Sequence, residues 1–290
     1  MSDRVQLVEV CPRDGLQNEA ATLPTETKVA LIERLIAAGC TRIEATSFVS
    51  ARAIPQLADA DDLFSRVSAL AGAELIALVP NERGYDRAVA AGCRSVEVFT
   101  AATDAFCQAN IRCTIAESFQ RFVPIMAKAD ADRIPVRGAV SVAFNCPYSG
   151  AVHPGAAIAV ARRLLEIGCS EVSIADTTGT ATADQVAALL AMVVKILPTD
   201  LVAMHFHDTT GLAVEHVVTS FDAGIRTFDG SAGGLGGCPF SPGAPGNVAS
   251  ESVLAAMDAR GIATGVNTEA IRETGAWIRA QLASAAHAPV

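Results

Sequence analysis

The stretch Pro24-Thr-Glu-Thr-Lys-Val-Ala-Leu-Ile-Glu-Arg-Leu-Ile-Ala-Ala-Gly-Cys40 decides the fold class of this 290-residue chain. It predicts an amphipathic helix, because its apolar residues recur at helical spacing along one stripe: Val29, Ile32, Leu35 and Ile36. Gly39 stands where a helix C-cap is expected, since glycine adopts the left-handed backbone of a helix end at little cost. The apolar run 42–48 follows at once. The stretch therefore predicts a helix that leads directly into a strand.

This succession of helix, glycine and strand recurs along the chain. Ala-Gly-Cys appears again at 91–93 and Ile-Gly-Cys at 167–169, each a residue or two before an apolar run. Eight runs rich in Val, Ile and Phe alternate with helical patterns, and we expect them to be strands: 6–11, 42–48, 74–80, 95–101, 136–144, 171–177, 201–208 and 227–233. Alternating β and α units with a period of about 30 residues are typical of an α/β fold with a parallel sheet.

Eight such units close most naturally into a (β/α)₈ TIM barrel, which typically takes about 250 residues. A doubly wound open sheet is the alternative, but no Gly-x-Gly-x-x-Gly follows the first strand. No Pro/Gly/Ser-rich linker divides the chain, so we expect a single barrel domain over residues 1–290. The segment 267–285 has the apolar spacing of one extra amphipathic helix after the barrel.

The net charge indicates which classes of partner are excluded, and the cysteine content indicates the cellular compartment. A net charge of −9 argues against nucleic acid or an anionic membrane as the general partner, whereas an anionic substrate remains open if local cations or a metal receive it. The eight cysteines form no Cys-x-x-Cys pair, which is typical of a reduced chain whose cysteines are small buried apolar residues. The N-terminus lacks the apolar run of a signal peptide, and no segment reaches the roughly 18 uncharged residues of a membrane span. We therefore expect a cytoplasmic protein.

The sequence His205-Phe-His-Asp208 ends the apolar run that begins at residue 201. Side chains two apart in a strand point to the same face, so His205 and His207 should turn toward one point. Barrels place their active sites at the carboxyl ends of the strands. Two convergent imidazoles at this end indicate a divalent-metal site. The alternative is two ordinary polar residues at a strand end, hydrogen-bonded to their neighbours.

Two further residues could complete such a site. Asp14 follows the first strand and supplies the carboxylate that two histidines lack, although it could simply be a turn residue before Gly15. Asn247 either caps a helix or brings a side-chain oxygen to the metal, and spacing does not separate these alternatives. Two imidazoles, a carboxylate and an amide oxygen leave positions open, and they suit Mg²⁺, Mn²⁺ or another first-row ion better than a closed structural zinc.

Charged residues also occur in strands that are otherwise apolar. An unpaired charge there would cost several kcal/mol, so we expect Glu44 and Asp176 to be paired inside the site; a structural ion pair is the alternative. Glu97 meets the same description, and its role stays open. Arg13, beside a candidate metal ligand, could stabilise an enolate or hold a carbonyl oxygen, or it could be a surface cation paired with an acid.

Cys238 differs from the other seven cysteines, because it follows a loop with four glycines and is poorly placed to fill a core. Glycines allow a loop to fold over a ligand and to change shape. A thiol in that position could deliver or remove a proton if nearby cations lower its pKa. A passive loop thiol is the alternative.

Four motifs then occur in order: Val8-Glu-Val-Cys-Pro-Arg-Asp-Gly-Leu-Gln-Asn-Glu19, Ile43-Glu-Ala-Thr-Ser-Phe-Val-Ser50, His205-Phe-His-Asp-Thr209 and Ala232-Gly-Gly-Leu-Gly-Gly-Cys-Pro239, the last followed by Gly246-Asn247. They closely resemble the 3-hydroxy-3-methylglutaryl-CoA lyase family, whose members are metal-dependent barrel lyases related to isopropylmalate synthase-type enzymes. The resemblance runs from about residue 5 to residue 285. Because the condensing relatives carry further C-terminal regions and this chain has one extra helix, we expect the lyase branch.

The resemblance implies cleavage of 3-hydroxy-3-methylglutaryl-CoA to acetyl-CoA and acetoacetate, with Mg²⁺ or Mn²⁺ as cofactor. The positions that match the family's metal ligands are Asp14, His205, His207 and Asn247. The positions that match its catalytic residues are Arg13 for the enolate, Cys238 on the loop, and the acids Glu44 and Asp176. We also expect His205 to take part in catalysis, and Arg13 and Gln17 to contact the substrate.

The chain departs from the family pattern after the histidines, where Asp208-Thr-Thr-Gly-Leu212 stands in place of Asp-Thr-Tyr-Gly-Gln. Thr210 lacks the ring of the expected tyrosine, so the pocket could accept a group other than methyl at C3. The alternatives are therefore a lyase for another 3-hydroxy acyl-CoA or a related divalent-metal aldolase. A non-catalytic barrel that binds a metal or acyl-CoA is a different class, and the loop thiol of Cys238 speaks against it. We expect the family's usual homodimer and no nucleic-acid or membrane partner.

Overall fold

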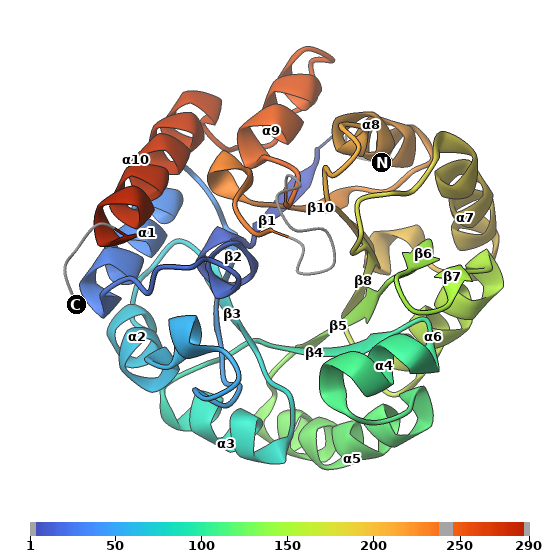
Figure 1. Cartoon of the computed structure of the whole chain (residues 1–290), viewed down its shortest axis with the longest axis horizontal. Coiled ribbons are helices and arrows are strands. Elements are labelled where there is room, and N and C mark those ends of the chain that lie inside the picture. The colour runs from blue at the N-terminus through green and yellow to red at the C-terminus, as the bar shows by residue number, and fades with distance from the viewer. Residues whose placement is uncertain (1–3, 238–245, 287–290) are drawn as a thin grey trace.

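The computed structural model describes residues 4–237 and 246–286, which form a closed barrel of eight parallel strands (Figure 1). The strands are β1 (Gln6–Glu9), β2 (Arg42–Ser47), β3 (Glu74–Leu78), β4 (Val96–Ala101), β5 (Val136–Ser141), β8 (Glu171–Asp176), β9 (Val202–Phe206) and β10 (Thr227–Gly230). They follow one another around the barrel in chain order, and β10 pairs with β1 to close it. The predicted (β/α)₈ barrel is confirmed.

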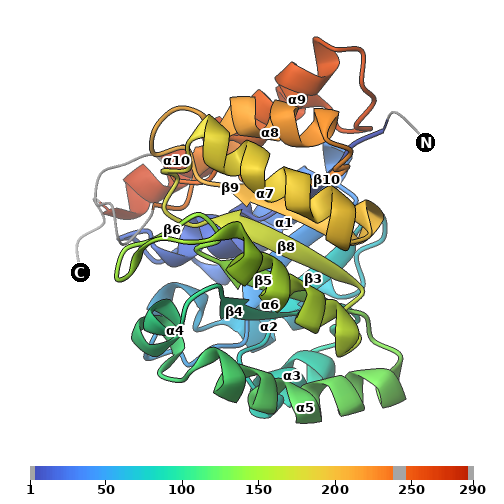
Figure 2. The same ribbon diagram turned by 90° about the vertical axis from the view of Figure 1, so that its right-hand side faces the viewer.

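Helices surround the strands on all sides and connect each strand to the next (Figures 1 and 2). They are α1 (Thr25–Ala37), α2 (Ala60–Val67), α3 (Glu82–Ala90), α5 (Ile115–Asp132), α6 (Pro154–Glu166), α7 (Ala183–Ile196), α8 (Ala213–Asp222) and α9 (Ser250–Asp258), with the shorter α4 (Asp104–Ile111) between β4 and α5. The tail predicted at 267–285 forms α10 (Thr268–Ala286). This extra helix contacts both α9 and α1, so it completes the ring where the barrel closes.

The repeated glycine after a helix is explained by its backbone. Gly39 has φ of +97°, and Gly92 and Gly168 at the corresponding positions have φ of +94° and +105°. The Gly39 amide donates to the carbonyl of Ile36, and the next amide, of Cys40, donates to that of Leu35. These bonds satisfy the last carbonyls of α1 and turn the chain toward β2. A Cβ at Gly39 would lie 2.6 Å from the Gly265 carbonyl oxygen, so a larger side chain is excluded there.

The strands end earlier than the apolar runs predict. The first run was predicted to reach residue 11, but β1 ends at Glu9 and Cys11–Gly15 form a single π-helical turn, which we label η1. In this turn the amides of Arg13, Asp14 and Gly15 all donate to the carbonyl of Val10. The eighth run was predicted to reach 233, but β10 ends at Gly230 and Ala232–Gly234 form a short 3₁₀ turn, η4. Apolar composition therefore marked burial correctly but overstated the length of extended backbone.

Other parts of the fold left no clear pattern in the sequence. The connection after β5 forms the hairpin β6 (Asn145–Cys146) and β7 (Gly150–Ala151), which was not predicted, and neither was α4. Apolar side chains pack mainly between strands and helices, as those of Leu7, Ile43 and Val98 do. The seven described cysteines are free and buried. No helix among the described residues is both long and apolar enough to cross a membrane.

We expect Gly275→Ala to destabilise the protein, although alanine in a helix interior ordinarily stabilises by about 1 kcal/mol relative to glycine. A Cβ at Gly275 of α10 would lie 2.5 Å from the amide nitrogen of Gly233 in η4. This neighbour is a backbone atom, so it cannot rotate away as the end of a flexible side chain could. Overpacking of this kind typically costs about 1–3 kcal/mol. The free energy of unfolding in urea measures the outcome. A variant as stable as the wild type, or more stable, would show that α10 does not pack this closely on η4.

Candidate metal centre

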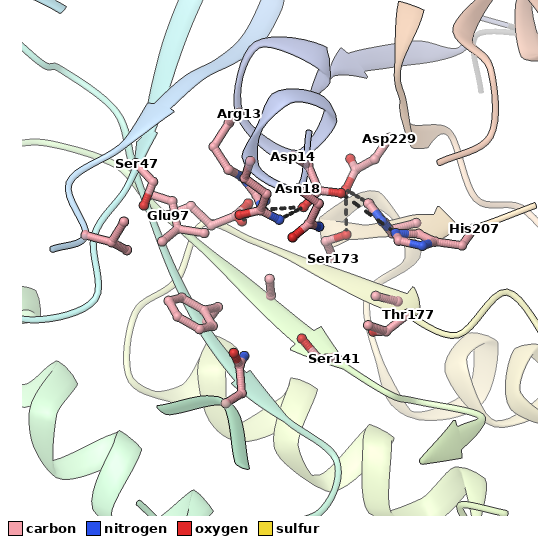
Figure 3. Close-up of a pocket in the computed structure, with 18 of the residues that line it drawn as sticks. Arg13, Asp14, Asn18, Ser47, Glu97, Ser141, Ser173, Thr177, His207 and Asp229 are labelled. Carbon is pink, nitrogen blue, oxygen red and sulfur yellow. Dashed lines mark hydrogen bonds and ion pairs between the residues drawn. The ribbon is translucent and has the colours of Figure 1, made fainter. Parts of the chain in front are cut away.

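Three of the predicted metal ligands meet at the carboxyl end of the barrel. One ligand atom each from Asp14, His205 and His207 lies within 4.8 Å of the others. The two histidine rings come from the end of β9 with their centroids 5.1 Å apart, as side chains two apart in a strand should be. Asp14 comes from η1, directly after β1, and Figure 3 shows its carboxylate turned toward His207. The three groups are buried or nearly so, which favours a bound ion over a solvated cluster.

Asn247 joins these residues from the far end of the sequence. Its side-chain amide donates to Asp14 Oδ2 at 2.7 Å and to the Leu235 carbonyl at 3.1 Å. Its Oδ1 is buried and has no hydrogen-bond partner among the described residues. The helix-cap interpretation of Asn247 is wrong, because α9 begins at Ser250 and its N-cap is Ala249. A buried, unpartnered amide oxygen beside two imidazoles and a carboxylate is what a divalent cation with mixed N/O ligands would satisfy.

Arg13 lies between the acids of the site. Its guanidinium contacts Asp14 Oδ1 at 2.5 Å, Glu44 Oε2 at 2.7 Å and Glu97 Oε1 at 3.7 Å. Burial alone would raise the pKa of the Asp14 carboxyl, but Arg13 and His207 outweigh burial and hold this pKa well below its usual range. Asp14 is therefore ionised at neutral pH, as a metal-ligating carboxylate must be.

Glu44 and Asp176 occupy different surroundings, although the sequence grouped them. Glu44 is paired with Arg13, and burial, reinforced by the charge of Glu97, raises its pKa to about 8. Asp176 contacts no arginine among the described residues; it accepts hydrogen bonds from the amides of Thr180 and Ala181, and burial raises its pKa. Neither acid is part of the cavity wall. Glu44 thus holds Arg13, and Asp176 holds the loop that follows β8.

A cavity of about 340 Å³ opens beside the three ligand groups (Figure 3). Arg13, Asp14, Gln17 and both histidines form one side of it. Small residues of β5, β8 and the residue after β8 form another part of the wall: Ala139, Ser141, Ser173, Ala175 and Thr177. Apolar side chains form much of the rest of the wall: Val49, Ile54, Leu78, Phe99 and Phe106. The cavity is therefore polar at the ligand cluster and apolar on the side of β3 and β4.

Three further residues singled out by the motifs are Gln17, Thr210 and Cys238. Gln17 lines the cavity, and its amide donates to Asp14 Oδ1 at 2.6 Å, so it holds the carboxylate of a candidate ligand. Thr210 is not part of the cavity wall; its hydroxyl donates to the carbonyl of Gly179. Cys238 lies outside the described residues, next to Gly237, whose carbonyl accepts a hydrogen bond from Asn18. With threonine at position 210, no ring reaches the cavity wall from this residue.

Asp229 is a residue of the site that the sequence reasoning missed. It lines the cavity from β10 and accepts hydrogen bonds from Ser173 and His205. The signal that marks Glu44, a carboxylate inside an apolar run, is weaker at Asp229, because Phe228 is the one large apolar residue of the predicted run 227–233. Glu97, whose role the sequence left open, also lines the cavity and contacts Arg13.

Comparison with known proteins identifies the family of the chain. The model of the HMGL-like family matches residues 4–278. The chain belongs to the HMGL-like family. Hydroxymethylglutaryl-CoA lyase of Pseudomonas mevalonii is 47% identical over 281 residues, which are 97% of this chain and 93% of that protein. The crystal structure of the HMG-CoA lyase from Brucella melitensis superposes with a TM-score of 0.93 at 45% identity, covering 96% of this chain and 98% of the other.

A third relative carries two substrates in its name. The 3-hydroxy-3-isohexenylglutaryl-CoA/hydroxy-methylglutaryl-CoA lyase of Pseudomonas aeruginosa is 43% identical over 279 residues, which are 96% of this chain and 93% of that protein. Members of the HMGL-like family at this level of identity thus include one named for substrates with a methyl group and with a much longer group at C3.

Glu9 ties together the segments of this HMGL-like chain that bear the site. Its Oε1 accepts the amides of Cys11 in η1 and Ala232 in η4, and its Oε2 accepts the hydroxyl of Ser250 at the start of α9. The side chain is fully buried. Burial raises the pKa of Glu9 to about 7 in spite of these three hydrogen bonds. A single carboxyl therefore joins the turn that contains Asp14, the turn after β10 and the start of α9.

We expect His205→Ala and His207→Ala each to weaken Mn²⁺ binding by more than about 100-fold, because the loss of an outer-shell partner alone costs about 10–100-fold. The matched control is His153→Ser, which removes an exposed histidine and keeps an oxygen at the N-cap of α6. Isothermal titration calorimetry of the metal-free protein measures the affinity. Unchanged affinity in either variant would exclude that histidine as a ligand.

We expect Glu9→Gln to alter how stability depends on pH. A carboxyl whose pKa rises from 4.5 to about 7 on folding favours the folded state below pH 4.5, and this contribution is lost as pH rises through 7. Glutamine does not titrate. The free energy of unfolding of the wild type minus that of Glu9→Gln should thus fall by about 2–3 kcal/mol between pH 5 and pH 8, at ~1.36 kcal/mol per pKa unit. Urea unfolding with EDTA present measures it, and parallel curves would contradict the raised pKa.

Proposed function

We propose that this protein is a divalent-metal-dependent carbon–carbon lyase that cleaves 3-hydroxy-3-methylglutaryl-CoA to acetyl-CoA and acetoacetate. The observation that carries the proposal is the meeting of Asp14, His205, His207 and Asn247 beside Arg13, at the mouth of a barrel, in a chain 47% identical to a lyase of that name. The four residues fit Mg²⁺ or Mn²⁺, which we propose as the cofactor.

A bound cation would lower the pKa of the substrate's 3-hydroxyl group and so favour loss of its proton. The electron pair left on that oxygen forms the keto group of acetoacetate as the bond between C2 and C3 breaks. The pair from the broken bond passes to the thioester fragment as an enolate, which becomes acetyl-CoA when C2 takes up a proton. The proton that leaves the hydroxyl is balanced by the one that C2 takes up, so the reaction needs no oxidant or reductant.

Individual residues of the chain can be assigned to the steps of this reaction. Arg13 lies next to Asp14, so its guanidinium is placed to hold the enolate oxygen, and Glu44 and Glu97 keep it oriented. Gln17 supports Asp14. We assign the proton for C2 to the Cys238 thiol, on the strength of the family resemblance and of its place after Gly237. The resemblance also implies a catalytic role for His205, which we propose it fulfils as a ligand of the cation.

A second candidate activity, the cleavage of substrates with a longer group at C3, also has specific support. The Pseudomonas aeruginosa relative is named for isohexenyl as well as methyl substrates, and the cavity here has an apolar side formed by Leu78, Phe99 and Phe106. We propose HMG-CoA as the main substrate and substrates with a longer C3 group as secondary ones. We also propose a homodimer in the cytoplasm, in keeping with the family and with the free, buried state of the described cysteines.

The proposal is tested by measuring acetyl-CoA release from a panel of 3-hydroxy acyl-CoAs that differ at C3, with Mg²⁺, Mn²⁺ or EDTA. We expect turnover of HMG-CoA with either cation, none with EDTA, a loss of at least about 1000-fold in kcat/KM in His205→Ala, and full activity in His153→Ser. Folded protein that binds the cation but turns over no member of the panel would favour a binding protein. Turnover of only a substrate with a longer group at C3 would show that this substrate, and not HMG-CoA, is the one the protein cleaves.

A further inference from the structure

A buried carboxylate lies directly behind one of the candidate metal ligands. Asp229 is 4% exposed, and its Oδ2 lies 3.3 Å from His205 Nδ1 and 2.9 Å from the hydroxyl of Ser173. Asp229 and His205 are cross-strand partners in the register of β10 with β9, so the barrel itself sets their separation. Because Nδ1 of His205 lies against Asp229, Nε2 is the ring nitrogen that remains for the candidate ion.

Asp229 is in turn held by a buried guanidinium. Arg137 on β5 is 3% exposed and donates to Asp229 Oδ1 at 2.6 Å. It also donates to Glu97 Oε2 at 2.9 Å and to Glu171 Oε1 at 2.7 Å, which are its partners in register on β4 and β8. Three carboxylates on three strands therefore fix Arg137, and Arg137 fixes Asp229.

We propose that Asp229, anchored by Arg137, is a positioning residue for the metal centre. The Nδ1–H of His205 donates to Asp229, which fixes the tautomer in which Nε2 carries its lone pair toward the cation. Glu97 extends the same network to Arg13 on the other side of the cavity. The inference rests on the proposed metal site but adds residues outside its ligand set. Partners of this kind orient a ligating imidazole and raise its affinity for the ion.

The substitution Asp229→Asn tests this positioning role, because only one orientation of the asparagine amide suits its hydrogen-bond partners. Arg137 can only donate, so the amide oxygen must stay on Arg137 and the NH₂ group must face His205 and Ser173. His205 Nδ1 then has to accept, and its proton moves to Nε2, where it blocks the cation. The control is Glu171→Gln, which makes the same change in the same network but contacts Arg137 and Arg42 rather than His205.

Two readouts apply to the metal-free protein. ¹⁵N NMR of labelled histidines, with the His205 signals assigned by their loss in His205→Gln, should show the Nδ1–H tautomer in the wild type and in Glu171→Gln, and Nε2–H in Asp229→Asn. Mn²⁺ titration followed by the EPR signal of the free ion should show affinity about 10–100-fold weaker in Asp229→Asn and within about 2-fold of wild type in Glu171→Gln.

The outcomes separate this inference from the proposed function. Wild-type protein with an Nε2–H tautomer at His205 would overturn the positioning role whether or not Asp229→Asn folds. Normal Mn²⁺ affinity in folded Asp229→Asn, or an equal loss in Glu171→Gln, would overturn it and leave the metal site intact. A wild type that binds no Mn²⁺ would instead overturn the metal site and, with it, any role for Asp229 there.

Discussion

The hydrogen bonding of β1 to β10 is the constraint on which the site depends. Residues 6 to 9 pair in register with residues 227 to 230, and this pairing closes the barrel. It brings the turn after β1, with Arg13 and Asp14, next to β9 and its histidines, which lie one strand beyond β10. Asn247 then reaches Asp14 across 233 residues of sequence. In an open sheet of the same strands, β1 and β10 would lie at opposite edges. Their residues could not then contribute to one ion-binding site.

The elements that the sequence predicted well are those set by local chemistry. The stripe from Val29 to Ile36 and the positive φ of Gly39 are properties of one short segment, so α1 and its joint with β2 could be found without knowledge of the rest. The strand ends could not be found in this way. Val10 and Cys11 are apolar and buried, yet they belong to a turn whose amides converge on one carbonyl, and composition does not distinguish buried turn from buried strand.

In the site, too, features set within one segment were predictable and features set by the packing of distant strands were not. Side chains two apart in one strand share a face, so His205 and His207 could be paired from their spacing alone. Which acid stands behind which ligand depends on register between strands, and a single sequence does not encode register locally. Asp229 was therefore missed although it is opposite His205, and Glu97 was recognised as unusual without a role.

The network also explains why a cation suits this barrel. Arg13 and Arg137 both contact Glu97, and between them they also contact Asp14, Glu44, Asp229 and Glu171. Even with Arg42, which pairs with Glu171, these five carboxylates outnumber the three guanidiniums. Buried charge of one sign in excess is costly. Without an ion, burial and the charge of Glu97 raise the pKa of Glu44 to about 8, so that a proton there offsets part of the excess. A divalent cation held by Asp14 and the histidines would offset it instead, which leaves Glu44 free to ionise and to hold Arg13 as a full ion pair.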